Sequence, residues 1–242
     1  EDYTNRGRII TPLKDRIGSQ IRTHYPLDVD TEVAIMRQEA RAASIGDVKV
    51  TMPVFMERVI AQFSQNARSS SHVNQRSGVS VRLSVSNYEI ISANAIRRAL
   101  HAGERDVAPR ISDMESIAAS TGGKVEFEVF EEGGESRILQ DLIKKSVMDV
   151  YRELTAGTSM QEVVTAFEQG AVAHTGEDMS SADLINYLAT IPALRAPVTG
   201  LVGDNASEAV TASAVEFILE GLHLTKRLNK DRSQGRATYR AK

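Results

Sequence analysis

The sequence predicts a mainly α-helical fold, and three observations lead to that prediction. Most of the 242 residues fall into segments in which apolar residues recur every three or four positions, the spacing that lines one face of a helix. Clean alternation of apolar and charged residues, which is typical of a half-buried strand, is confined to one short stretch. Hydrophobic residues make up 41% of the chain and charged residues 25%, so the chain can build a normal globular core.

The first 26 residues predict a short helix, a turn at Gly18-Ser19 and a short strand. Pro26 ends this strand, because proline has no N–H to donate to a neighbouring strand. A helix opens next, with Asp30 as the expected N-cap residue. Two longer amphipathic helices are expected to follow, one beginning near Pro53 and one running from about residue 82 to 101.

The second half of the chain is predicted to be helical apart from one strand or hairpin. Residues 124–130 alternate, with Val125, Phe127 and Val129 expected to face the core. Glycine pairs bound this strand on both sides and predict turns there. Helices are predicted over residues 109–121, 136–157, 160–167, 180–188 and 205–228, with Pro192 and Pro197 interrupting the chain before the last of them.

The last 17 residues, 226–242, are predicted to form a basic tail that is frayed or extended. They carry seven basic residues against the single acidic residue Asp231 and have few apolar side chains. Two interpretations stay open, a solubilising tail and a docking strap for an acidic partner or a nucleic acid. The basic residues are Lys226, Arg227, Lys230, Arg232, Arg236, Arg240 and Lys242.

Composition excludes several classes of function. A formal net charge of −3 argues against a protein that coats nucleic acid or a membrane surface. The absence of cysteine excludes disulfides, thiolate metal sites and a cysteine nucleophile, and it fits a cytoplasmic location. No apolar run approaches the roughly 18 residues needed to cross a bilayer. The five histidines are scattered, with none at the spacing typical of metal ligands, so no metal site is expected.

A complete nucleotide-binding loop is missing from these residues. Such a loop ends in Gly-Lys-Ser/Thr, where backbone amides hold the phosphates and the hydroxyl holds Mg²⁺. The dipeptide Gly123-Lys124 is followed by Val125 and is expected to end a helix and start a strand, the reverse of the order that a phosphate loop requires. A Gly-x-Ser-x-Gly hydrolase elbow is also absent.

Three stretches resemble AAA+ ATPases of the magnesium chelatase I-subunit-like and MoxR-like group. The stretch Leu13-Lys14-Asp15-Arg16-Ile17-Gly18 is similar to the Leu-x-Asp-Arg-Phe-Gly segment of that group, with Ile17 replacing the usual phenylalanine. The runs from Asn74 to Arg82 and from Leu219 to Lys230 also resemble it. The resemblance implies four regions: the end of an α/β AAA+ core (1–26), a helical lid (27–104), a helical C-terminal extension (105–225) and the basic tail (226–242).

The resemblance assigns Arg16 as an arginine finger and Asp15 as a residue of the subunit contact. An arginine supplied by a neighbouring subunit stabilises the charge that builds on the γ-phosphate during phosphoryl transfer. Arginine suits this role because its planar, permanently charged group contacts two oxygens at once. The alternative is an ordinary helix-end arginine that pairs locally with Asp15.

A second arginine, Arg82, is the expected sensor 2 residue, which in AAA+ proteins contacts the bound γ-phosphate from the start of a lid helix. Arg76 is the second choice for this role. A positive charge at a helix N-terminus opposes the helix dipole, and that cost is easier to accept where an anion binds. The alternative is that Arg82 is an ordinary exposed arginine.

The function that the resemblance implies is that of an ATPase that remodels a partner protein or inserts a metal. Its Walker A and B regions are expected upstream of Glu1, and ATP and Mg²⁺ are expected to bind the full-length parent, with no hydrolysis by this fragment alone. The parent is expected to be a cytoplasmic homo-oligomer, a hexameric ring, with a von Willebrand A domain protein as partner and with neither a membrane nor a nucleic acid. Two alternatives stay open, a non-enzymatic helical scaffold and a nucleic-acid-linked regulator that acts through the basic tail.

Overall fold

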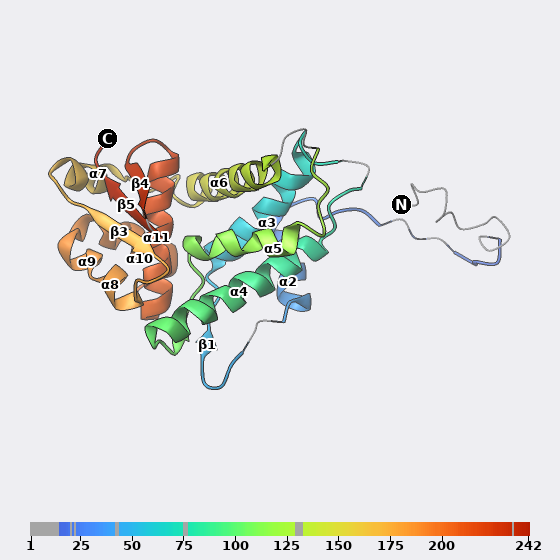
Figure 1. Cartoon of the computed structure of the whole chain (residues 1–242), viewed down its shortest axis with the longest axis horizontal. Helices are drawn as coiled ribbons and strands as arrows, with labels where there is room; N and C mark the ends of the chain where they lie inside the picture. The colour runs from blue at the N-terminus through green and yellow to red at the C-terminus, as the bar shows by residue number, and fades with distance from the viewer. Residues whose placement is uncertain are drawn as a thin grey trace.

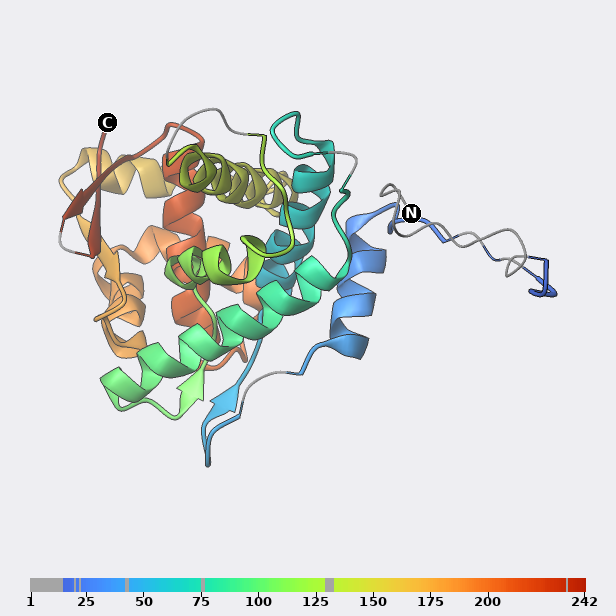
Figure 2. The same ribbon diagram turned by 45° about the vertical axis from the view of Figure 1, so that its right-hand side comes forward.

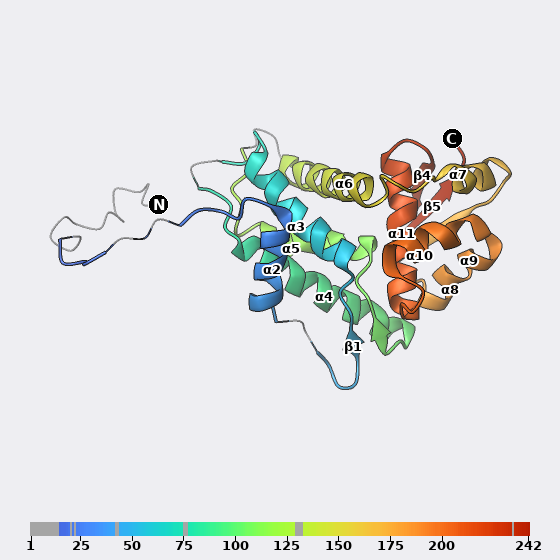
Figure 3. The same ribbon diagram turned by 180° about the vertical axis from the view of Figure 1, so that it is seen from behind.

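Helices dominate the fold, which confirms the mainly α-helical prediction (Figure 1). The computed structural model describes residues 15–19, 21, 23–41, 44–74, 77–128, 133–233 and 235–242. Strands are few and short among these residues. One helix, α11 (Glu208–Leu224), stands between the long helices of residues 29–154 and the smaller helices and sheet of the C-terminal part (Figures 1 and 3).

Four of the longer helices form a packed group, and α4 runs diagonally across it from the side of α2 (Figure 2). Asp28, rather than the expected Asp30, caps the first of these helices and accepts a hydrogen bond from the Thr31 N–H at 2.7 Å. Two short strands of two residues each, β1 (Lys49–Val50) and β2 (Asp106–Val107), pair in parallel. The four helices are α2 (Val29–Glu39), α3 (Val54–Ser69), α4 (Arg82–Ala102) and α6 (Gly134–Leu154).

The other elements are short helices and a three-stranded antiparallel sheet in the order β3-β5-β4. The strands are β3 (Ala173–Gly176), β4 (Asn229–Ser233) and β5 (Arg236–Arg240). The helical elements are η1 (Ile111–Ser116), α5 (Ile117–Thr121), α7 (Gln161–Glu168), α8 (Ser181–Ile185), α9 (Tyr187–Thr190), η2 (Pro192–Leu194) and α10 (Arg195–Val202).

The core is built around α11, which is buried on nearly every side. Its Phe217 ring lies 4.7 Å from the ring of Phe55 on α3 and 6.0 Å from that of Tyr151 on α6. One cluster of buried apolar side chains extends from Val33 to Tyr239, so both halves of the chain share a core. A small second cluster lies under the C-terminal part of α4 and consists of Val48, Ala95, Ile96, Ala99 and Val107.

The basic tail is neither frayed nor extended, so this expectation was wrong. Residues 229–233 and 236–240 form the two strands β4 and β5, which pair with each other and, through β5, with β3, and which cover α11. Tyr239 is 1% exposed and Ala237 is 8% exposed, so alternate residues of β5 face the core. Gly235 has a φ of 79° in the turn, a conformation that glycine adopts without strain.

Three smaller expectations also need correction. The segment 124–128 has the predicted alternation, but it pairs through one isolated bridge, Val73 to Phe127, and residues 129–132 are outside the described part. Residues 15–19, 21 and 23–26 form neither helix nor strand, because no described strand lies beside them; the rest of that predicted unit is outside the described residues. Pro197 lies in the first turn of α10 rather than between helices, where its missing N–H has no helical acceptor to lose.

The contact between α6 and α11 depends on Gly221. A Cβ atom at this position would overlap the ring of Tyr151. We therefore expect Gly221→Ala to lower the free energy of unfolding by about 1–3 kcal/mol, as overpacking does, despite the better helix propensity of alanine. Urea unfolding followed by circular dichroism measures this loss.

Gly200 in α10 is the matched control, because no atom lies within 4 Å of a Cβ built there. Gly200→Ala should leave stability unchanged or raise it by up to about 1 kcal/mol. Equal effects of the two substitutions would contradict the packing that we describe.

Candidate functional site

The candidate site is the surface at the start of α4, where the chain places Arg82. Arg82 is the first residue of this 21-residue helix, and its side chain is exposed. Its backbone N–H donates to the Ser80 hydroxyl at 3.2 Å, whereas its guanidinium has no ion pair or hydrogen bond to any described residue. No acidic residue occupies the first turn, so the positive charge stands uncompensated at the positive end of the helix dipole.

A buried ion pair between α2 and α3 lies beneath this surface. Glu32 is fully buried and accepts two hydrogen bonds from Arg68, one to each carboxylate oxygen, at 2.5 and 2.8 Å. The two parallel contacts use the planar guanidinium in the geometry that gives the strongest charge-assisted bonds. Because both partners are largely removed from water, the pair also fixes how α2 and α3 lie against each other.

The same pair anchors the beginning of α4. The Ser84 hydroxyl, in the first turn, donates to Glu32 and lies 2.6 Å from the hydroxyl of Ser64. The Nε of Arg68 donates to the carbonyl of Val79 at 3.0 Å, so the loop before α4 is held as well. The position of the helix start is therefore set by buried polar contacts on both sides of Arg82.

Residues 23–26 pack against this network from outside. The ring of Tyr25 lies 4.9 Å from the guanidinium carbon of Arg68, a cation–π contact. The side-chain amide of Gln65 donates to the Pro26 carbonyl at 3.2 Å. Gly78 has a φ of 69°, and a Cβ atom there would overlap the Tyr25 hydroxyl, so this position needs glycine. The chain that leads back to Arg16 thus passes beside the loop before Arg82.

The other predicted site residues are not brought together with Arg82 by any described contact. Asp15 and Arg16 are exposed and form no ion pair with each other or with other described residues. The described residues 15–19 lie away from the helical body (Figure 1). Arg76 is outside the described residues.

The polar network under Arg82 was missed by sequence analysis, although one signal was present. Glu32 lies four residues before Met36 and next to Val33, so a carboxylate sits on the apolar face of α2. A charged residue on that face is seldom buried unless it is paired. Its partner, Arg68, is 36 positions away, and the pattern of α3 alone does not identify it.

The cations of the basic segment are mostly paired within the chain. Lys230 contacts Glu220, Arg232 contacts Glu115 at 2.5 Å, Arg236 contacts Asp178, and Arg240 contacts Asp231. Arg227 donates to the side chain of Gln161 at 2.8 Å. The segment therefore presents less free positive charge than its composition predicts.

Within the described part of the chain, no helix combines the length and apolar character needed to cross a membrane. The same residues contain no group of three or more histidine, aspartate or glutamate side chains arranged to hold a metal ion. A scan against protein-family models found no matching family, and searches of curated proteins and of solved structures found no match. The resemblance to AAA+ ATPases therefore rests on the sequence motifs alone.

The Glu32–Arg68 pair should contribute strongly to stability. Glu32→Gln leaves Arg68 without a counter-charge and points an amide at groups that are already donors. We expect a loss of about 3–5 kcal/mol in the free energy of unfolding, as is found when one partner of a buried pair is removed. Chemical denaturation of the purified variant measures it.

The exposed pair between Arg105 and Asp47 provides the control. Asp47→Asn should cost less than about 1 kcal/mol, because solvent screens such pairs. If Glu32→Gln cost no more than Asp47→Asn, the anchoring role of the buried pair would be refuted.

Proposed function

We propose that this chain is part of an AAA+ ATPase of the magnesium chelatase-like group and that Arg82 contacts the terminal phosphate of bound ATP as sensor 2. The observation that supports this best is the setting of Arg82. An exposed guanidinium without a described partner stands at the start of a long helix whose first turn is anchored to a buried ion pair. By contrast, three arginines of the neighbouring helices α2 and α3, Arg37, Arg58 and Arg68, are paired with carboxylates.

The chemistry that this arrangement allows is charge stabilisation. Phosphoryl transfer places negative charge on the γ-phosphate oxygens, and a positioned guanidinium lowers the energy of that state without taking part in bond making. A rigid anchor matters because misplacing a stabilising group by about 1 Å forfeits much of its effect. In this proposal Arg16 acts as the finger toward the nucleotide of a neighbouring subunit, and Asp15 contributes to the subunit contact.

In this proposal, the contacts of residues 23–26 couple the nucleotide to the lid. Tyr25 contacts both Arg68 and the loop before α4, and we propose that movement of the segment that carries Arg16 reaches the start of α4 through Tyr25. In the proposed machine, α2, α3 and α4 form the lid, and its closure on ATP is transmitted through this network. The nucleotide loop and the Mg²⁺ ligands are supplied from outside these 242 residues, because the chain has no Gly-Lys-Ser/Thr loop.

The wider setting is part of the same proposal. The parent works as a cytoplasmic hexameric ring and uses ATP hydrolysis to remodel a partner with a von Willebrand A domain or to insert a metal. The absence of cysteine supports a reducing compartment. A helical scaffold remains the second candidate function, because the shared core around α11 could present a rigid surface without nucleotide. Pairing of Lys230, Arg232 and Arg236 within the chain weakens the case for a nucleic-acid-linked regulator.

An ATPase assay of the protein that contains both this chain and a nucleotide loop tests the proposal. Arg16→Ala should lower kcat by at least about 100-fold, since a finger arginine acts in the transition state. Arg82→Ala should lower kcat and also weaken nucleotide binding. The 242-residue chain alone should show no turnover.

Arg152→Ala is the matched control, because Arg152 is an exposed arginine on α6 without a described partner. It should leave kcat and KM unchanged. Mixing Arg16→Ala subunits with subunits that lack the nucleotide-loop lysine should restore activity, because each supplies what its neighbour is missing. Wild-type rates in both Arg16→Ala and Arg82→Ala would favour the scaffold.

A further inference from the structure

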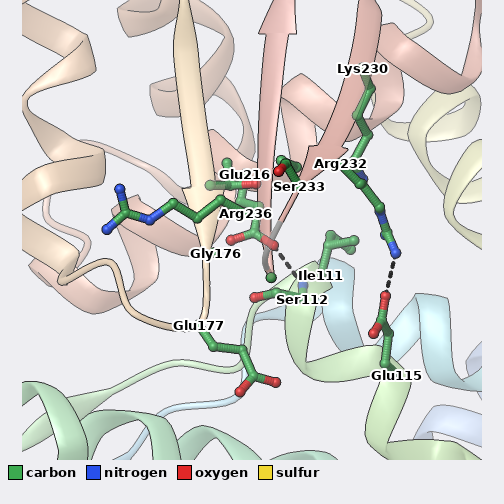
Figure 4. Close-up of a pocket in the computed structure, with 13 residues that line it drawn as sticks. Ile111, Ser112, Glu115, Gly176, Glu177, Glu216, Lys230, Arg232, Ser233 and Arg236 are labelled. Carbon is green, nitrogen blue, oxygen red and sulfur yellow. Dashed lines mark hydrogen bonds and ion pairs between the residues drawn. The ribbon is translucent and has the colours of Figure 1, made fainter.

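A pocket of about 300 Å³ lies between the inner face of the three-stranded sheet, α11 and η1 (Figure 4). Glu216 of α11 forms part of its wall and is 2% exposed. One oxygen of this carboxylate, Oε1, accepts from the backbone N–H of Ser112 at 2.6 Å. The other, Oε2, is buried and has no hydrogen-bond partner among the described residues, and neither does the nearby Ser112 hydroxyl.

A second glutamate of α11 that faces the sheet, Glu220, has the hydrogen-bond donors that Glu216 lacks. Glu220, one helical turn further along α11, is contacted by the ammonium of Lys230 and accepts from the Tyr239 hydroxyl at 2.5 Å. Lys230 and Tyr239 are directly opposite each other in the β4–β5 register. Glu220 is therefore provided with both a cation and a neutral donor from the sheet.

The pair of sheet residues above Glu216 supplies no equivalent donors. The residues opposite each other in the register are Arg232 and Ala237. The methyl group of Ala237 cannot donate, and Arg232 turns toward Glu115, as Figure 4 shows. Arg236 points away from the pocket and pairs with Asp178. The pocket is the space that the small side chain of Ala237 and the outward-turned Arg232 leave above Glu216.

The buried charges behind the pocket also leave negative charge uncompensated. Arg98 and Asp113 are joined at 3.1 Å, and Glu104 lies 3.9 Å from both Arg98 and Arg110. With Glu216, this cluster holds three carboxylates and two arginines and so has one excess negative charge when all are ionised. Burial raises the pKa of Glu216, and Arg110 opposes that shift only in part, without a hydrogen bond between the two side chains.

We propose that this pocket binds a ligand through a primary ammonium or guanidinium group, which donates to the free oxygen of Glu216 as Lys230 donates to Glu220. A single positive charge neutralises the cluster, and the Ser112 hydroxyl offers a second polar contact. The volume suits a small aliphatic amine or one lysine or arginine side chain, since it is at the lower limit for small-molecule sites. The site is independent of Arg82 and does not rest on the ATPase proposal.

Isothermal titration calorimetry of the 242-residue chain tests this inference with defined probes. Butylammonium chloride should bind, whereas n-butanol, the uncharged analogue of similar size, should not. Glu216→Gln keeps the acceptor for the Ser112 N–H and should weaken butylammonium binding by at least about tenfold, the usual scale for loss of a charged hydrogen bond. An acetylated, amidated Gly-Lys-Gly peptide and 1,4-diaminobutane distinguish a protein side chain from a free amine as the natural source of the cation.

Two further variants separate charge from shape. Ala237→Met should fill the pocket without changing any charge and should abolish binding. Glu177→Gln removes an exposed carboxylate at the pocket that pairs with Arg97, and it should change the affinity by no more than about threefold. Equal binding of butylammonium by wild type and Glu216→Gln, equal binding of n-butanol and butylammonium, or no binding of any cation would each overturn the inference.

Discussion

The ion pair between Glu32 and Arg68 is the interaction on which the first half of the structure depends. It joins α2 to α3 directly, reaches α4 through Ser84, and holds the loop before α4 through the carbonyl of Val79. A buried pair of this kind is stable only when its remaining hydrogen-bonding positions are filled, because desolvation otherwise exceeds the Coulomb attraction. Here Gln65 and Ser84 complete the coordination of the carboxylate, so the network is satisfied and rigid.

The rigidity of this network fixes the position from which the exposed Arg82 can contact a ligand. An arginine on a flexible loop would contact an anion only at a large entropic cost, whereas Arg82 starts a helix whose first turn cannot shift without breaking buried bonds. Tyr25 extends the same network to the segment that leads to Arg16. Under the proposed function, a phosphate bound by Arg82 would change the packing of α2, α3 and α4, because the start of α4 is joined to the other two helices.

The sequence predicts the helices well because their apolar periodicity is local. Helix α3 begins where Pro53 indicates, and α4 spans the predicted residues, since each signal lies within the helix itself. The hairpin could not be predicted in the same way. Charged residues occupy half of the positions in β4 and β5. The positions that face the core, Ala237 and Tyr239, are buried only because β5 pairs with β3, which lies more than 60 residues earlier. The turn at Gly235 and the alternation around Tyr239 were usable signals, but the net positive charge of the segment outweighed them.

The candidate site was predictable only in part, for the same physical reason. The position of Arg82 at the start of a helix was predictable, because a helix start is a local feature. The buried ion pair that anchors this helix start was not predictable, because Glu32 and Arg68 are 36 positions apart and meet only when α2 packs on α3. Glu216 is similar: nothing within α11 distinguishes it from Glu220, and the difference arises because the sheet presents Lys230 and Tyr239 to one and Ala237 to the other.

The two ends of α4 therefore meet two buried networks of opposite character. At the start, the carboxylate of Glu32 is fully coordinated, and its pair with Arg68 is electrically neutral. Toward the end, Arg98 enters a cluster in which carboxylates outnumber arginines and buried polar atoms of Arg110 and Glu216 lack partners. Satisfied networks hold a fold in one arrangement, whereas unsatisfied ones retain free energy that a bound group can recover. A helix of 21 residues spans about 30 Å. Helix α4 therefore connects the satisfied network around Glu32 with the cluster behind Glu216, in which a bound cation would supply the missing positive charge.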